Sequence, residues 1–183
     1  LSWAPRWHYA LVMGYDLDQG DIILRSGTQA RQSMPLRTFE YTWARSQHWS
    51  MLLAKPGSLP DEVDAPHAEQ AALGFEQLNG ASLSIPVWTS ITQRWPERLL
   101  PQMALGNAYM NSGHWPDAAR IFKAVTHQFD SATAWNNLAQ VQMHQGLRDQ
   151  ALASAQRGLR IARTKEPRWI DALTRTLQSI QTD

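Results

Sequence analysis

Two glycines that lie 33 residues apart, Gly113 and Gly146, limit most strongly the folds open to this chain. The same shift superimposes three further pairs of small or apolar residues: Leu105 with Leu138, Gly106 with Ala139, and Ala118 with Ala151. A fixed period of roughly 20 to 50 residues is typical of chains that stack copies of one small supersecondary unit. Because the segment contains mostly helix formers, the period predicts stacked helical repeats.

A more diverged unit precedes these two, because a shift of 34 places Phe122 over Trp88 and Tyr109 over Phe75. We therefore expect a helical domain over 65–183, built from helix pairs at 65–98, 99–131 and 132–165. The segment 167–181 should form a helix that covers the apolar face of the last pair. Small residues are expected where paired helices touch, namely at Gly106, Ala118, Ala139 and Ala151.

The succession Leu105-Gly106, Tyr109, Gly113, Ala118 and Phe122 resembles the tetratricopeptide repeat. The resemblance implies a protein or peptide ligand on the concave face made by the first helix of each pair. Counting along those helices predicts five residues that project into this face: Asn107, Asn111, Asn136, Gln140 and His144. Carboxamides both donate and accept hydrogen bonds, so they suit a peptide backbone. Lys and Arg are missing from these positions, which argues against capture of a C-terminal carboxylate, as some relatives perform it.

Residues 1–57 have a different character and predict a mixed α+β part, followed by a linker at 58–64 that is rich in turn and acidic residues. The apolar runs 9–15 and 22–24 flank Asp- and Gly-containing residues 16–21, which predicts an antiparallel β-hairpin. Leu36, Phe39 and Trp43 have helical spacing, so a short helix is expected through Arg45. The run 48–54 is expected to return as a strand.

The stretch His8-Tyr9, four apolar or small residues, and Gly14-Tyr15-Asp16 resembles the second half of a bacteriocin-processing, papain-like cysteine peptidase. The resemblance covers about residues 1–57 and implies that His8 is the base that deprotonates a cysteine nucleophile. No cysteine occurs in this chain, so the chain as given cannot perform that reaction. Since the sequence begins with Leu1, we expect the start of the protein to lie upstream.

Relatives of this peptidase type place an Asp-Pro pair at the end of the second strand to orient the base, whereas this chain continues Arg25-Ser26-Gly27-Thr28. If the hairpin turns near Asp18, antiparallel pairing brings roughly residues 26–29 opposite His8. The orienting group is then a hydroxyl or an amide, from Ser26, Thr28 or Gln29.

Composition excludes several classes of function. The 17 Lys and Arg residues nearly balance the 16 Asp and Glu residues, and no run of like charges predicts nucleic-acid binding. The cluster Arg157, Arg160, Arg163, Lys165 and Arg168 is interpreted as a solvated helix face. We expect no metal site, because the histidines lack ligand spacing, no cofactor, because no phosphate-binding glycine loop occurs, and no membrane span. Resemblance to exported relatives favours a bacterial envelope or periplasmic location, with the cytoplasm as the alternative.

Two functional hypotheses follow from the sequence. In the first, the chain is part of a cysteine-peptidase-like protein that carries the catalytic His8 and a repeat domain for protein or peptide binding. In the second, it is a non-catalytic interaction or scaffold protein with a degenerate peptidase-like part. The missing Asp-Pro favours the second and the His8-to-Asp16 stretch favours the first, to which we give a narrow preference.

Overall fold

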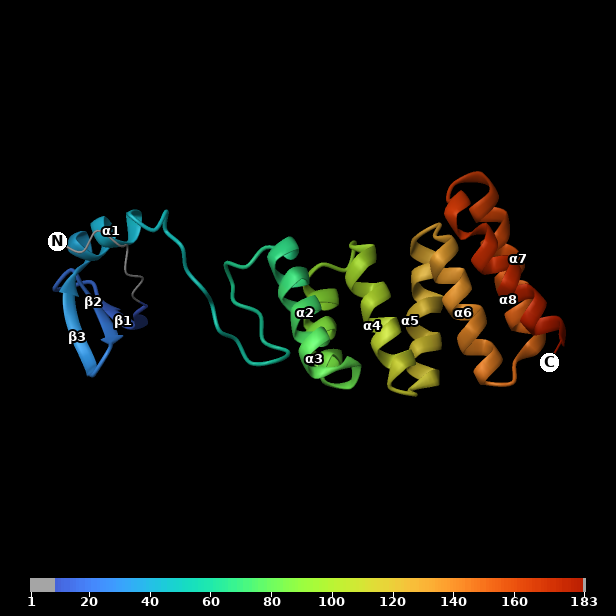
Figure 1. Ribbon diagram of the computed structural model, residues 1–183, viewed down its shortest axis with the longest axis horizontal. Helices are drawn as coiled ribbons and strands as arrows, with labels where there is room; N and C mark the ends of the chain where they lie inside the picture. Colours follow the sequence, from blue (N-terminus) through green and yellow to red (C-terminus); the bar gives the residue numbers. More distant parts are fainter. Residues whose placement is uncertain (1–8, 183) are drawn as a thin grey trace, which may run out of the picture. The chain divides into compact units, whose positions relative to one another are not determined.

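The computed structural model describes residues 9–182, in two compact units (Figure 1). The first unit, which ends at Leu52, contains three strands and one helix, and we call it the sheet unit. The second begins at Leu53 and contains only helices; we call it the helical unit. The expected order of an α+β part before a helical solenoid with a terminal helix is therefore confirmed.

The sheet unit consists of β1 (Leu11–Asp16), β2 (Asp21–Ser26), β3 (Gln29–Pro35) and α1 (Leu36–Ala44), with antiparallel strands in the order β1-β2-β3. The predicted hairpin is formed by β1 and β2. Its turn is closed by the carboxylate of Asp16, whose Oδ1 accepts the backbone N–H groups of Asp18 and Gln19 at 3.1 and 3.0 Å. Gly20 follows with φ of 68°, a conformation that glycine adopts without steric cost.

The third strand differs from the sequence prediction. The run 48–54, expected as a strand, has no strand structure, and its Leu53 side chain is 79% exposed. The added strand is instead β3, whose residues are mostly polar. It forms because Gly27, with φ of 57°, permits a tight turn that pairs Ser26 with Gln29. Backbone pairing along β2 selects β3, whereas in residues 9–182 the more apolar run pairs with neither outer edge of the sheet.

Burial in the sheet unit is slight. Among its described residues, the buried hydrophobic side chains are those of Ile22 and Leu24, both on the central strand β2. The register of β1 shifts between Val12 and Gly14, which is a β-bulge, and the apolar side chains of β1 are exposed. Backbone hydrogen bonds rather than a packed interior therefore hold these strands together.

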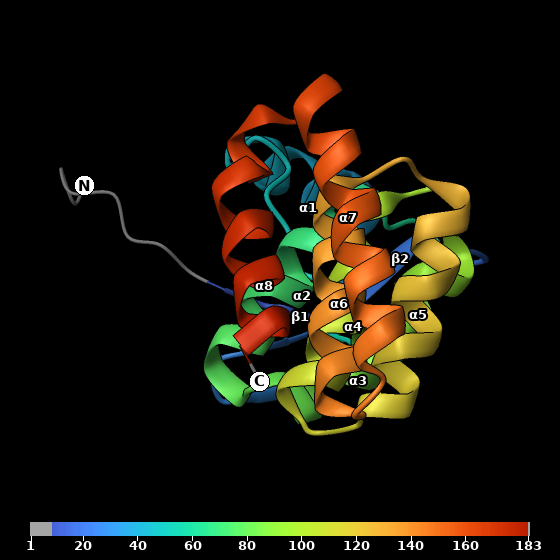
Figure 2. The ribbon, with the colours of Figure 1, turned by 90° about the vertical axis from the view of Figure 1, so that its right-hand side faces the viewer.

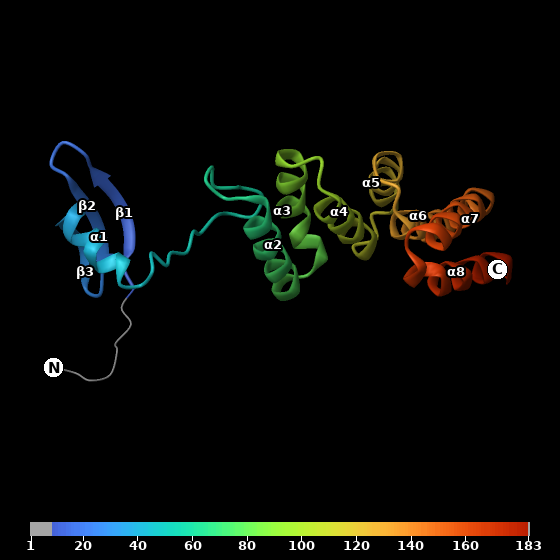
Figure 3. The same ribbon diagram turned by 90° about the horizontal axis from the view of Figure 1, so that it is seen from above.

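The helical unit contains three helix pairs and a final helix (Figure 3). The pairs are α2 (Ala65–Asn79) with α3 (Ala81–Arg94), α4 (Leu99–Asn111) with α5 (Trp115–Gln128), and α6 (Ala132–His144) with α7 (Arg148–Thr164). A 3₁₀ turn at Pro167–Trp169 leads into α8 (Ile170–Thr182). Figure 2 views this unit from its α8 end, with α7 and α8 in front of the earlier pairs.

The helix ends follow local chemistry. Gly113 and Gly146, which revealed the period, occupy the turns inside the second and third pairs with φ of 75° and 73°. Asp64 caps α2, and Ser131 caps α6 by accepting the backbone N–H of Ala134. Gly113 and Gly146 end the first helix of successive pairs 33 residues apart, and this spacing is the length of the repeat.

Small residues allow the paired helices to approach, as predicted. Ala118, Ala139 and Ala151 are fully buried. At Gly106, an added Cβ would lie 2.5 Å from Cε1 of Phe122, so only glycine fits between α4 and that ring. Gly158 plays the same part between α7 and its neighbours, since a Cβ there would lie 2.8 Å from Cδ2 of Leu173 on α8.

The first pair uses polar anchors in place of some repeat markers. The carboxylate of Glu76 on α2 accepts hydrogen bonds from Ser84 Oγ at 2.9 Å and from Trp88 Nε1, both on α3. The buried Glu69 pairs with Arg98, whose Nη2 donates to Oε2 at 2.9 Å. This pair raises the pKa of Arg98, chiefly through the hydrogen bond to Glu69. Buried charge of this kind must be paired to be tolerated, which ties α2 to the start of the second pair.

Candidate functional site

Three of the four residues expected to serve a peptidase lie at one end of the sheet. His8 lies outside the described residues. Ser26, Thr28 and Gln29 surround the β2–β3 turn, and the pairing of Leu11 with Arg25 brings the start of β1 beside that turn. Thr28 and Gln29 are exposed. Their role in orienting a base stays a prediction.

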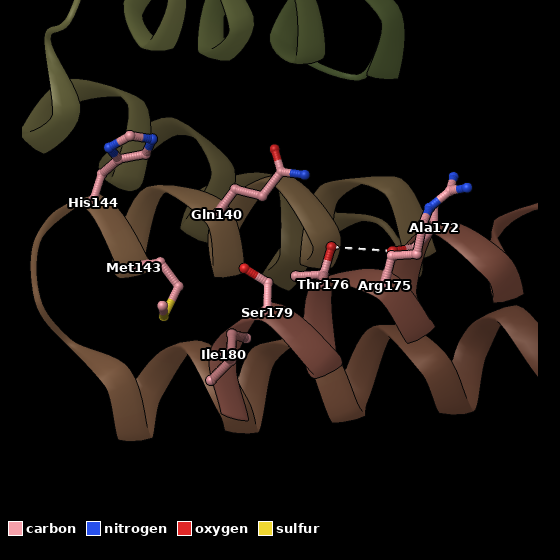
Figure 4. Close-up of a pocket in the computed structure, with 8 residues that line it drawn as sticks. All are labelled: Gln140, Met143, His144, Ala172, Arg175, Thr176, Ser179 and Ile180. Atoms are coloured by element: carbon pink, nitrogen blue, oxygen red, sulfur yellow. Dashed lines mark hydrogen bonds between the residues drawn. The ribbon is translucent and has the colours of Figure 1, made fainter. Parts of the chain in front are cut away.

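The helical unit carries two adjoining hollows on its α6 side. The first, of about 550 Å³, lies between α6 and α8 (Figure 4). The second, of about 440 Å³, lies between α6 and the turn that joins α4 to α5. Both are lined by Gln140 and His144, so these two side chains form a shared wall. We call the two hollows together the α6 groove.

Three elements supply the remaining lining. The first hollow adds the following side chains: Met143 from α6, and Ala172, Arg175, Thr176, Ser179 and Ile180 from α8. The second adds Met110, Asn111, Gly113 and Trp115. The lining therefore contains both polar and apolar side chains. Of the five residues predicted for the concave face, Asn111, Gln140 and His144 line it.

The other two predicted residues make contacts within the helical unit. Asn107 Oδ1 accepts a hydrogen bond from Asn137 Nδ2 at 2.9 Å, which joins α4 to α6. Asn136 is buried, and its Oδ1 accepts a hydrogen bond from Thr176 Oγ1 at 2.8 Å, which joins α6 to α8. Sequence counting did not select Asn137. Its carboxamide is the half-buried link between the first helices of successive pairs.

His144, which lines both hollows, stacks on Trp115, which lines the second. The ring of His144 lies parallel to the indole of Trp115, with centroids 4.1 Å apart and planes inclined by 10°. The stack brings the end of α6 against the start of α5. It adds aromatic carbon to the lining, against which an apolar side chain of a ligand can pack.

Arg175 changes the electrostatics that the sequence predicted. The concave face was expected to lack Lys and Arg because only the first helices of the pairs were counted. The final helix α8 supplies Arg175 to the first hollow, and neither hollow is lined by an Asp or a Glu. Arg175 belongs to the segment 167–181, which the sequence predicts only as a capping helix.

Ion pairs elsewhere in the helical unit serve its structure. Hydrogen bonding to the backbone N–H of His67 lowers the pKa of Asp64, as expected for a helix cap. Lys165 contacts Asp130 across the end of the third pair and lowers the pKa of that carboxyl by hydrogen bonding to it. Neither acidic residue lines the α6 groove.

Residues 9–182 contain neither a cluster of metal ligands nor a membrane-spanning helix. Within that range no three His, Cys, Asp or Glu side chains gather as a metal site would require. Over the same residues, every helix is too short or too polar to pass through a lipid bilayer.

Comparison with known proteins agrees with this architecture. A sequence model of the tetratricopeptide repeat family matches residues 103–166, which span most of the second and third helix pairs. No curated protein matches the chain with significant sequence similarity. The family match and the stacked helix pairs together identify a tetratricopeptide repeat domain.

Solved structures share the fold of the helical unit at low sequence identity. The TPR2B domain of yeast Sti1 in complex with pHsp70 is 12% identical, with a TM-score of 0.60 over 64% of this chain and 96% of that one. The Yersinia enterocolitica secretion chaperone SycD, with a peptide of the translocator YopD, is 10% identical, with a TM-score of 0.60 over 67% and 98%. The first TPR of Spaghetti (RPAP3), bound to the HSP90 peptide SRMEEVD, is 13% identical, with a TM-score of 0.56 over 67% and 97%.

Proposed function

We propose that the helical unit binds a segment of another protein, as an extended peptide, in the α6 groove. The observation that carries this proposal is that the two hollows adjoin, since both are lined by Gln140 and His144, and that together they extend from the α4–α5 turn to α8. A surface of this kind fits a chain that runs across several helices. A compact small molecule would be expected to occupy one enclosed cavity instead.

The lining chemistry suits a peptide backbone. An extended segment presents an N–H and a C=O at each residue, and these groups lose water when they enter a groove. Gln140 and Asn111 offer a donor and an acceptor each, and Ser179 offers a hydroxyl. The stack of Trp115 and His144 can pack against an apolar side chain of the ligand.

The structural neighbours support the same function. Each of the three described above was solved with a partner or a peptide of one, named as pHsp70, a YopD peptide and an HSP90 peptide. Peptide binding by a tetratricopeptide repeat domain is therefore the function best supported for this chain.

An array of 12-residue peptides, probed with the full chain, tests the proposal. Peptides that bind are then measured by calorimetry against the variants Gln140→Ala and Asn111→Ala. Each change should weaken binding by about threefold to tenfold, the value of one or two neutral hydrogen bonds. Gln156→Ala is the matched control, because Gln156 is exposed on α7 and does not line the groove. Full affinity in both groove variants would place the binding surface elsewhere.

The peptidase hypothesis is less well supported. It rests on a sequence resemblance around His8, and none of the three structural neighbours is described as a peptidase. It stays a prediction with its own test. In a protein that includes the cysteine nucleophile, His8→Ala should abolish peptide cleavage and leave peptide binding by the helical unit unchanged. Unchanged cleavage would remove His8 from the mechanism.

A further inference from the structure

The α6 groove carries one charged side chain, and its charge has no partner among the described residues. Arg175 is exposed on α8, and no carboxylate of residues 9–182 lies within ion-pair distance of it. Three other cations of the helical unit form ion pairs, Arg98 with Glu69, Arg120 with Asp117, and Lys165 with Asp130, but none of these three lines the groove. Asp171, one turn earlier on α8, makes no ion pair with Arg175.

The half of the helical unit that contains Arg175 has a net positive charge. From Leu53 to Ala119, Asp and Glu outnumber Lys and Arg, whereas from Arg120 to Thr182 the basic residues are in excess. The α6–α8 hollow belongs to the basic half, and its lining contains no carboxylate. An acidic segment would therefore approach this part of the helical unit under attraction, and a basic segment under repulsion.

From these observations we propose that the α6 groove selects peptide segments that carry an acidic side chain, and that the carboxylate binds the guanidinium of Arg175. The inference rests on the proposed peptide-binding function and adds the chemical class of the ligand. A guanidinium presents donors in a planar fork that matches the two oxygens of a carboxylate. Arg175 would thus anchor the ligand from the final helix, outside the repeat helices where carboxamides stand.

The arrangement of the lining residues defines how a bound peptide would be oriented. Figure 4 shows His144 at one end of the first hollow and Arg175 at the other, with Gln140 between them on the same side. A segment that crosses Gln140 can place its carboxylate on Arg175 and a neighbouring apolar side chain toward the His144–Trp115 stack. Ser179 faces the space between α6 and α8 and can accept or donate one further hydrogen bond.

We assign the carboxylate to an acidic side chain rather than to a chain end. Arg175 is exposed at the rim of the hollow, so a bound segment can continue past it into solvent. A terminal carboxylate would offer the same two oxygens. The two sources are separated by measuring peptides with an amidated C-terminus.

Paired peptides provide the test. The array carries each 12-residue sequence in two amidated forms, one with Asp and Glu and one with Asn and Gln at the same positions, and is probed with the full chain. The acidic form of a binding pair should bind at least about tenfold more tightly, and added salt should reduce the difference. Arg175→Gln should lower the affinity of the acidic form to that of its amide form and leave the amide form unchanged.

Arg168→Gln is the matched control, since Arg168 is exposed, lies just before α8 and does not line the groove. It removes the same net charge and should leave the acidic preference intact. Circular dichroism confirms that both variants keep their helices.

Each contrary result has a distinct meaning. If amide forms bind as tightly as acidic forms, acid selection is wrong and the peptide-binding function stands. A loss of preference in Arg168→Gln equal to that in Arg175→Gln would attribute selection to net charge and overturn the assigned anchor. Binding only of peptides with a free C-terminal carboxylate would overturn the assignment to a side chain. Binding of neither form overturns both proposals.

Discussion

The sheet unit and the helical unit are stabilised by different means. In the helical unit, Trp88 and Phe122 are fully buried, and glycine or alanine stands where helices meet. In the sheet unit, Trp49 is 56% exposed, and strand pairing extends over side chains that mostly face solvent. Side-chain volume therefore constrains the helical unit, whereas backbone geometry at turns constrains the sheet unit. The same substitution should therefore cost much more stability in the helical unit than in the sheet unit.

The largest expected effect is the loss of a buried indole. Trp88→Ala removes a fully buried side chain that packs with Ala72 and Ile91 and donates to Glu76. We expect a loss of about 3 to 5 kcal/mol in the free energy of unfolding, because a cavity remains and the half-buried carboxylate of Glu76 loses one of its two donors. Urea titration of the full chain, followed by circular dichroism, measures this loss.

Trp49→Ala supplies the comparison in the sheet unit and should change stability by less than about 1 kcal/mol, as exposed side chains usually do. Its ring contacts Tyr9 edge-on, but its carbonyl, which accepts the indole N–H of Trp43, is kept by the substitution. Equal losses at the two tryptophans would break the contrast between the units.

The next effect is smaller and depends on packing around a single methyl group. Gly106→Ala should destabilise the chain by about 1 to 3 kcal/mol, because the new Cβ meets the ring of Phe122. Gly74→Ala is the matched change inside α2, where an added Cβ meets nothing within 4 Å. It should stabilise the chain by up to about 1 kcal/mol through the higher helix propensity of alanine. Thermal unfolding of both variants distinguishes these outcomes, and a tolerated Gly106→Ala would contradict the tight crossing.

The smallest effect concerns how helices begin in the two units. The helix α2 starts with the carboxylate of Asp64 accepting the N–H of His67 at 3.0 Å, whereas α1 starts after Pro35 without a side-chain cap. Because the pKa of Asp64 is lowered in the folded chain, its contribution to stability is present above its unfolded pKa. That contribution is lost as the pH falls through the lowered folded pKa.

Asp64→Asn keeps a capping oxygen but cannot titrate, so its stability should fall less steeply than that of the unmodified chain between about pH 5 and pH 2. Urea midpoints collected across that range provide the measurement. Other carboxyl groups, including Asp130, titrate in both proteins and cancel in the difference. Parallel curves would show that the carboxylate charge of Asp64 does not stabilise α2.

The helical fold could be predicted from sequence because its determinants are periodic. Gly113 and Gly146 mark equivalent turns, and Ala118 and Ala151 mark equivalent crossings, so one pattern carries the same information twice. The strand β3 carries no such signal. Its residues are mostly polar, and only Gly27 at its turn indicates that the chain reverses there. Hydrophobic content predicted the wrong third strand because backbone pairing decides this part of the fold.

Only the part of the candidate site that lies on the repeat helices could be predicted. Gln140 and His144 follow from counting along one helix, because residues three to four apart share a face. Arg175 depends on how α8 packs across α6, and the register of that packing is set by contacts between distant residues, such as Thr176 with Asn136. A pattern within one helix does not specify the side of a neighbouring helix that completes the groove.

The hydrogen bond between Thr176 and Asn136 also has a thermodynamic consequence. Since α8 forms one wall of the hollow, a ligand that touches both walls binds only those molecules in which α8 is docked. Occupancy must then suppress detachment of the last helix, and at a ligand concentration 100 times the Kd the suppression amounts to about 2.7 kcal/mol. Amide hydrogen exchange along α8 should slow about a hundredfold under that condition, so the end of the chain would report on occupancy.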